Sequence, residues 1–214
     1  MLILASSSPR RSALLTALGL DFKAISVSID ESPLAGELPE KYVLRLATEK
    51  AAAIAVRHPR QDIVIAADTL VVLDGRFLGK PSTPEEAVTM LKSLRRRAHQ
   101  VYSGLAVLSG NVNFTLTDWC LTEVTMRDYW DEEIQAYVAS GDPLDKAGGY
   151  AIQHRGFNPV EKLVGCYTNV IGLPLCHLVR LLKQSHLSPP TDITQGCITP
   201  EGYECQLMHL SFEN

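Results

Sequence analysis

Apolar residues along the chain alternate between short continuous runs and longer amphipathic stretches, the mixture typical of an α/β protein. Residues 2–5 form a continuous apolar run, which predicts a short buried strand. Three serines follow, and Ser8 as N-cap with Pro9 at the first helical position predicts a helix with Leu15 and Leu18 on its apolar face. The start of a helix therefore faces whatever lies beyond the first strand, and its free N–H groups can bind an anion.

The same periodicities predict the elements that follow. We expect strands over residues 22–32, 62–68, 99–108 and 114–126, and a hairpin over 70–81 that turns at Asp74 and Gly75. We expect helices over 38–59, 83–98, 131–140 and 172–184, and a glycine-rich loop over 141–156 that leads into a short strand. The pattern stops after Gln184, so a domain over 1–185 and a C-terminal tail over 186–214 are predicted. The fold class is α/β, with a mixed twisted sheet and flanking helices.

Composition narrows the class of protein. With 214 residues, of which 46% are hydrophobic, the chain can form a core without a metal or disulfide. The net charge of −4 disfavours a broad basic face, so we expect no nucleic acid as partner. The five cysteines are scattered without a C-x-x-C pair, which favours reduced thiols. We find no leader segment and no apolar run long enough to span a membrane, and expect a soluble cytoplasmic protein without a membrane partner.

Charged side chains collect at the predicted ends of elements and in loops. The acids are Asp30, Glu31, Asp68 and Asp145, and the bases are Arg10, Arg11, Lys50, Lys80 and Lys146. Because open α/β sheets bind ligands beyond the carboxyl ends of their strands, these groups are expected in one crevice. Carboxylates suit Mg²⁺, and arginine and lysine suit phosphate, so the mixture favours a nucleotide polyphosphate with its metal.

Each of these features also has a plainer explanation. Arg10 and Arg11 can be solvated on a first helical turn, and Lys50 can extend to solvent from the edge of its helix. Acids in loops are often turn or capping residues. Asp68 is the hardest to explain in this way, because we expect it at the end of a buried apolar strand.

Eight short segments stand in the order seen in the Maf family of nucleoside triphosphate pyrophosphatases. They are ASSSPRRSALL, SIDES, YVLRLATEKA, IAADTLV, LGKP, HQVYSG, DPLDKAGGYAIQ and GLPL, between Leu2 and Lys183. This resemblance implies a fold similar to the inosine triphosphate pyrophosphatases, with two lobes around a central cleft. It also implies a homodimer and cleavage of a nucleoside triphosphate to the monophosphate and pyrophosphate with a divalent metal ion, Mg²⁺ or Mn²⁺.

The resemblance implies a role for particular residues. Asp68 would accept a proton from the attacking water, and Glu31 and Asp68 would hold the metal ion. The substrate-binding residues would be Ser6, Arg10, Arg11, Lys50, Thr69, Lys80, Lys146 and Gln153. Among these, Arg11, Lys50 and Lys80 would hold the triphosphate, and Arg10, Thr69 and Gln153 match the positions that set base choice.

Gln153 resembles the branch of the family that acts on dTTP and UTP rather than 7-methyl-GTP. A glutamine amide both donates and accepts, which suits the edge of thymine or uracil. His154 and Arg155 stand where relatives move directly to glycine. This basic pair can touch phosphate or another base, or it can lie in a solvated loop.

We therefore expect hydrolysis of dTTP and UTP, including modified pyrimidine nucleotides. Two alternatives stay open: a purine-type enzyme acting on ITP or XTP, and a nucleotide-binding regulator of cell division without turnover. Retention of the acids and lysines together favours catalysis. Cys197, Cys205 and His209 could form a metal set, but their loose spacing and the absence of a fourth ligand argue against zinc. His99 and His177 are expected to be structural.

Overall fold

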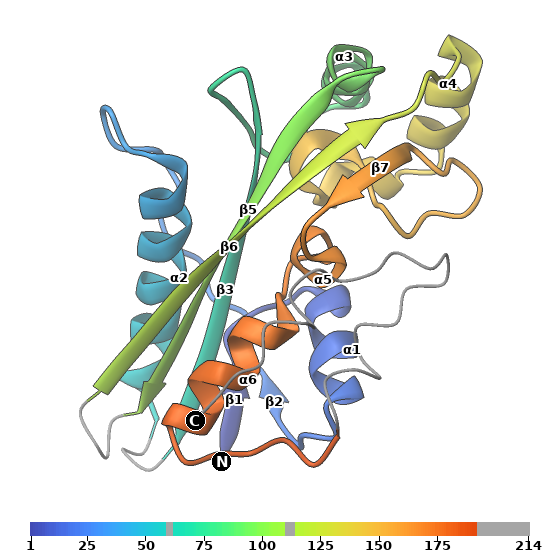
Figure 1. Cartoon of the computed structure of the whole chain (residues 1–214). Helices are drawn as coiled ribbons and strands as arrows, with labels where there is room; N and C mark the ends of the chain where they lie inside the picture. Colours follow the sequence, from blue (N-terminus) through green and yellow to red (C-terminus); the bar gives the residue numbers. More distant parts are fainter. Residues whose placement is uncertain (59–61, 110–113, 192–214) are drawn as a thin grey trace.

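The computed structural model describes residues 1–58, 62–109 and 114–191 (Figure 1). Within these residues one seven-stranded sheet has the order β2-β1-β3-β5-β6-β7, and β4 pairs with β3 beside this path. Strand β1 (Leu2–Leu4) is parallel to β2 (Lys23–Ala24) and β3 (Ile63–Leu73), whereas the remaining pairings are antiparallel. The remaining strands are β4 (Arg76–Leu78), β5 (Ala98–Ser109), β6 (Phe114–Met126) and β7 (Val160–Val164). The predicted α/β class and mixed sheet are confirmed.

Helices cover both faces of the sheet. They are α1 (Pro9–Ala17), α2 (Pro39–Ala55), α3 (Pro84–Leu94), α4 (Asp131–Ala139), α5 (Tyr167–Ile171) and α6 (Leu175–Gln184), with two short 3₁₀ helices, η1 (Asp142–Asp145) and η2 (Ala147–Gly149). Figure 1 shows α2 on one side of the long strands and α1, α5 and α6 on the other. Because side chains alternate along a strand, Leu2 and Leu4 pack with α1 and α6, whereas Ile3 and Ala5 pack with α2.

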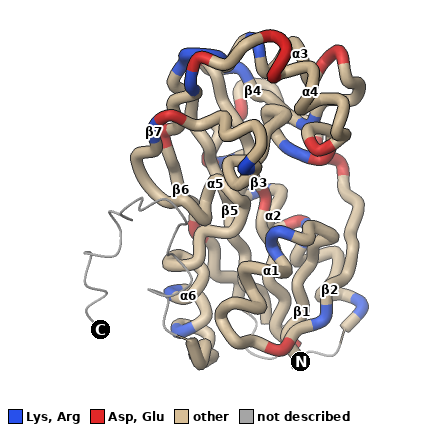
Figure 2. The backbone as a smooth tube through the Cα atoms, turned by 90° about the vertical axis from the view of Figure 1, so that its right-hand side faces the viewer, with Lys and Arg blue, Asp and Glu red and all other residues tan. Residues whose placement is uncertain are grey.

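A second core lies at the far end of the long strands. There α3, α4 and β7 pack on the ends of β3, β5 and β6 around the buried side chains of Leu91, Tyr129 and Ile134. The strands β3, β5 and β6 run through both cores (Figure 1). Figure 2 shows α3 and α4 at one end of the molecule and β1, α1 and α6 at the other, so the chain has the two lobes that the family resemblance implies.

Strand β3 is longer than either of its neighbours on one edge. Its residues 63–65 pair with β1 and its residues 71–73 pair with β4. In the described part of the chain, no strand pairs with this edge between Ala66 and Leu70. The prediction that the strand stops at Asp68 is therefore wrong: Asp68 and Thr69 lie in the middle of an eleven-residue strand, where its edge is open.

Further boundaries differ from expectation. The helix expected over 38–59 ends at Ala55, and the one expected over 172–184 begins at Leu175. The strand expected over 22–32 is paired only at Lys23 and Ala24, because β1 ends at Leu4 and offers no partner beyond that point. The following residues pack their apolar side chains against the α2 side of the sheet without strand pairing. Helix α3 ends at Leu94 rather than residue 98, because Arg95 turns to extended backbone before β5 begins.

Other local predictions are confirmed. Asp74 and Gly75 both have positive φ, as a tight hairpin turn requires (49° and 75°).

The start of the predicted tail packs on the core: Leu187 contacts it, and the backbone of Thr191 bonds to Leu18 at the end of α1. The possible metal set in the tail lies outside the described residues. Within the described residues, no helix combines the length and apolar character needed to cross a bilayer.

Candidate active site

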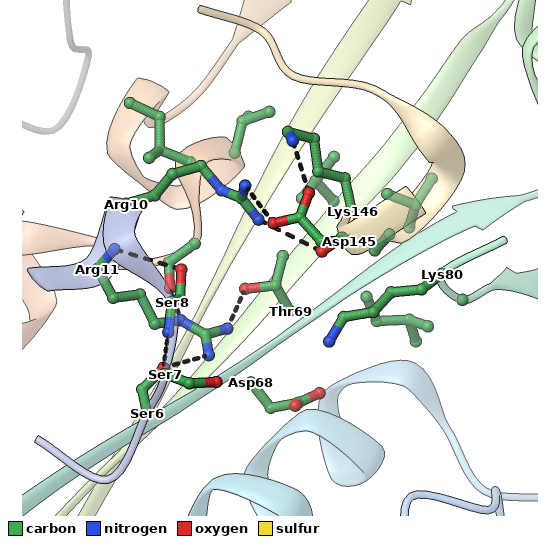
Figure 3. A pocket seen from close by; sticks show the side chains of 18 of the residues that line it. Ser6, Ser7, Ser8, Arg10, Arg11, Asp68, Thr69, Lys80, Asp145 and Lys146 are labelled. Atoms are coloured by element: carbon green, nitrogen blue, oxygen red, sulfur yellow. Dashed lines mark hydrogen bonds and ion pairs between the residues drawn. The ribbon is translucent and has the colours of Figure 1, made fainter. Parts of the chain in front are cut away.

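A pocket of about 280 Å³ lies between the two lobes, against the open edge of β3 (Figure 3). Its walls come from the end of β1, the start of α1, helix α2, the loop after β4, and the segment from η1 to Gln153. The residues to which the family resemblance gives a role all line it: Ser6, Arg10, Arg11, Glu31, Lys50, Asp68, Thr69, Lys80, Lys146 and Gln153. Asp145 lines it as well. Asp30, which was expected in the same crevice, does not line it: its side chain is exposed and accepts from the backbone N–H of Ser32. The topology therefore brings together side chains that lie far apart in the sequence.

Lys50 and two carboxylates form a compact charged cluster at one wall. The Lys50 Nζ atom lies 2.6 Å from Asp68 Oδ1 and 2.6 Å from Glu31 Oε1. The side chains of Lys50 and Asp68 are each only 10% exposed, whereas that of Glu31 is 49% exposed. Lys50 thus turns inward from α2 to a buried partner and does not extend to solvent.

The two carboxyl groups of this cluster differ in acidity. Burial raises the pKa of Asp68, although Lys50 and Arg11 act in the opposite direction. Partial burial also acts to raise the pKa of Glu31, but the bond to Lys50 and the charges of Lys80 and Arg11 lower it overall. The pKa of Asp68 is therefore shifted upward and that of Glu31 downward, and the Oδ2 atom of Asp68 makes no hydrogen bond within the described residues.

Arg11 is a half-buried cation without a carboxylate bonded to it in the described structure. Its Nε donates to the carbonyl of Gly172 at 2.9 Å, its Nη1 to Ser6 Oγ at 3.4 Å and its Nη2 to Thr69 Oγ1 at 3.1 Å (Figure 3). Burial lowers the pKa of Arg11, and the nearby Asp68 opposes this. Three of the five N–H groups of a guanidinium are thus fixed by neutral oxygens, and the rest can bind an anion.

The start of α1 adds neutral donors to the same wall. Ser8 caps the helix as predicted, because its Oγ accepts from the backbone N–H of Arg11. Ser6 Oγ accepts from the backbone N–H of Ser8 as well as from Arg11, which leaves its own hydroxyl hydrogen free to donate. Lys80 is exposed at the pocket and has no ion pair among the described residues. These groups form a site for negative charge.

Arg10 crosses the mouth of the pocket. Its Nη1 lies 3.1 Å from Asp145 Oδ2 on η1, so an ion pair joins the two lobes. Asp145 also holds Lys146, whose Nζ contacts Asp145 Oδ1 at 2.6 Å and Asp142 Oδ1 at 2.9 Å. The ammonium of Lys146 is therefore already surrounded by acceptors, and its contact with substrate stays a prediction.

The wall beyond Lys146 carries Gln153, which is exposed in the pocket. His154 does not lie in a solvated loop: its Nδ1 accepts from the backbone N–H of Phe157 at 2.9 Å, and its ring packs on Tyr137. This half-buried ring supports the loop, whereas Arg155 is exposed.

Several residues in or behind the pocket wall were not predicted to matter. Gly172 supplies the carbonyl that Arg11 bonds to, with a φ of +115°. Ser103 and Asn169 are fully buried, and Ser103 Oγ lies 2.9 Å from Thr69 Oγ1. Gly172 and Ser103 fall within the segments GLPL and HQVYSG, but nothing in their spacing indicates a contact with Arg11 or Thr69. Helix α5, which positions Asn169 and Gly172, was not expected at all.

The predicted histidines lie away from the pocket. His99 is buried, and its Nε2 atom lies 2.7 Å from the hydroxyl of Tyr150, which does line the pocket. His177 Nδ1 lies 2.7 Å from Asp118 Oδ2, and neither residue lines the pocket. Both side chains hold elements together.

The chain is similar in sequence to known proteins. The model of the family described as Maf-like protein matches residues 1–185. The chain belongs to the Maf family. A protein of Thermomicrobium roseum named dTTP/UTP pyrophosphatase is 45% identical over 207 residues, which are 96% of this chain and 93% of the relative. A Desulfotalea psychrophila protein of the same name is 47% identical over 87% of this chain and 96% of the relative.

The chain also shows a low similarity to solved structures. The Staphylococcus aureus Ham1 protein is 16% identical, with a TM-score of 0.46 over 86% of this chain and 98% of that chain. A Coxiella burnetii HAM1 protein is 16% identical, with a TM-score of 0.41 over 72% of this chain and 88% of that chain.

Proposed function

We propose that this Maf protein hydrolyses nucleoside triphosphates, dTTP and UTP foremost, to the monophosphate and pyrophosphate. The observation that carries this proposal is the half-buried guanidinium of Arg11, which is bonded only to neutral oxygens and stands beside a carboxylate of raised pKa. Such a cation needs an anion to complete its surroundings, and a triphosphate supplies one. The names of the relatives, dTTP/UTP pyrophosphatase, support the substrate and the reaction.

Each group then has a chemical task. Asp68 takes the proton of a water molecule that attacks the α-phosphorus, and its burial makes it a better base at neutral pH. Arg11 and Lys80 hold the phosphates and offset the negative charge that develops on the pyrophosphate leaving group. Lys50 keeps the Asp68 carboxylate oriented through the 2.6 Å contact. Gln153 faces the base from the other lobe.

A divalent metal ion fits the same cluster. Within the described residues, no group of three or more His, Cys, Asp and Glu side chains could hold a metal by itself. Mg²⁺ in nucleotide enzymes is commonly bound by one or two carboxylates together with substrate phosphates, and Glu31 and Asp68 provide such a pair. That these carboxylates already enclose the Lys50 ammonium indicates that the cluster suits a cation. Mg²⁺ or Mn²⁺ bound there would withdraw charge from the phosphates.

The test is pyrophosphate release from dTTP, UTP, CTP, ITP and 7-methyl-GTP with Mg²⁺. We expect dTTP and UTP to lead, and Asp68→Asn to abolish release while nucleotide still binds, as measured by a thermal shift. Asp30→Asn is the matched control, because Asp30 is exposed and bonds only to Ser32 in the described structure. If ITP led, the base assignment would be wrong; if nucleotides bound without turnover in the wild type, a regulatory role would replace catalysis.

Two further expectations of the family resemblance belong to this proposal. We propose that the protein acts as a homodimer, for which light scattering after size exclusion is the test. We also propose that it works in the cytoplasm, where its substrate pool lies and where its cysteines stay reduced.

A further inference from the structure

Ser103 lies directly behind the pocket wall formed by Thr69. The two residues are opposite each other in the register of β5 and β3, and Ser103 is fully buried. Its Oγ atom has two oxygen neighbours, Thr69 Oγ1 at 2.9 Å and the carbonyl oxygen of Asn169 at 3.0 Å. Ser103 does not line the pocket, so it can act on a ligand only through Thr69.

The positions of the hydroxyl hydrogens follow from this geometry. A carbonyl can only accept, so Ser103 must donate its single hydrogen to Asn169. Its contact with Thr69 then needs the Thr69 hydroxyl as donor, because two lone pairs would otherwise face each other at 2.9 Å. Thr69 Oγ1 in turn accepts from Nη2 of Arg11. The chain of donors therefore runs from Arg11 through Thr69 and Ser103 to the carbonyl of Asn169.

This direction limits what Thr69 can offer to a ligand. Its hydroxyl hydrogen is used inside the protein, so on the pocket side Thr69 Oγ1 has only a lone pair. Ionised phosphate oxygens also only accept hydrogen bonds, and an acceptor is a poor partner for them. A ligand group with an N–H matches this wall instead.

We propose that Ser103 is a positioning residue for base choice, because it keeps Thr69 as an acceptor that matches the N3–H of uracil or thymine and rejects the N3 lone pair of cytosine. This inference rests on the proposed function. Cytosine is rejected because its N3 atom and Thr69 Oγ1 are both acceptors and would face each other. Such an unpaired contact discriminates more strongly than the loss of a single apolar contact.

The test is the ratio of kcat/KM for UTP to kcat/KM for CTP. Ser103→Ala leaves the Thr69 hydroxyl without its acceptor, so that it can turn and donate into the pocket. We expect the ratio to fall about tenfold, through a gain on CTP. Ser109→Ala is the matched control: Ser109 is a buried serine of the same strand, without a side-chain hydrogen bond in the described residues, and its loss should leave the ratio unchanged.

Thr69→Val separates this effect from a general weakening of the site. It removes the hydroxyl, so the ratio should fall through loss of UTP turnover without a gain on CTP, and it carries the test alone if Ser103→Ala does not fold. A ratio within twofold of wild type in a folded, active Ser103→Ala protein would overturn the inference. So would a change confined to the ratio of UTP to dUTP, which would place the ribose at Thr69. A wild type that releases no pyrophosphate from any nucleotide would instead refute the proposed function.

Discussion

Replacing Lys50 with methionine tests the charged cluster of the pocket. The variant keeps most of the side-chain volume but leaves the Asp68 carboxylate without the ammonium that lies 2.6 Å away. Glu31 can turn to water because its side chain is 49% exposed, whereas Asp68 cannot, with 10% exposed. The cost therefore falls on Asp68.

The size of the effect follows from the burial of the pair. Removing one partner of a buried ion pair costs about 3–5 kcal/mol, and the pocket beside Asp68 lets water reach part of the carboxylate, which favours the lower end. We expect the free energy of unfolding to fall by about 3 kcal/mol and Tm by roughly 6–12 °C in a protein of this size.

The assay is urea unfolding in buffer that contains a chelator and no nucleotide, so that no other cation replaces Lys50. Lys50→Met combined with Asp68→Asn should recover most of the loss, because no buried charge is then left alone. Lys41→Met, on an exposed position of the same helix, should change stability by less than about 0.5 kcal/mol. A Lys50→Met protein as stable as wild type, or a double variant no more stable than the single one, would refute the cluster as described.

Two other predictions follow from groups near the site. Burial lowers the pKa of His99 to about 4, below its ordinary value of 6.5, so protonation of this side chain destabilises the fold as the pH falls from 6.5 toward 4, by about 3 kcal/mol in all. Urea unfolding of His99→Gln at several pH values should lack this part of the pH dependence. Gly172→Ala places a methyl group 3.2 Å from Thr69 Oγ1 at a φ of +115°, so it should lower the free energy of unfolding by about 1–3 kcal/mol and reduce pyrophosphate release. Gly36→Ala, with positive φ but nothing within 4 Å, should keep activity, and equal activities of the two variants would contradict the role of Gly172.

Whether a feature could be predicted from the sequence depends on whether its contacts are local or join distant parts of the chain. The first strand, the Ser8 cap and the hairpin turn at Asp74 and Gly75 are local features, and their residue patterns predicted them. The open edge of β3 was missed because it depends on where two other strands stop, which no local pattern records. For that reason Asp68 was expected at a strand end.

The candidate site divides in the same way. Arg11 could be picked out because it stands on the first turn of a predicted helix, and Lys50 because a charged residue stands among apolar ones on its helix. Ser103, Asn169 and Gly172 could not, since a serine in a strand or a glycine at the end of a helix is ordinary. Their contacts join positions such as Ser103 and Asn169 that are 66 residues apart.

The open edge of β3 also bears on pairing between chains. An unpaired strand edge can add a strand from another chain, which is a common route to aggregation. Here the unpaired stretch between Ala66 and Leu70 is short and is closed off by β1 at one end and β4 at the other, so no long strand can dock there. A small ligand can still reach it. The interruption that creates the pocket thus leaves room for a small ligand but not for a long strand of another chain. Protection from misassembly comes from the lengths of two neighbouring strands.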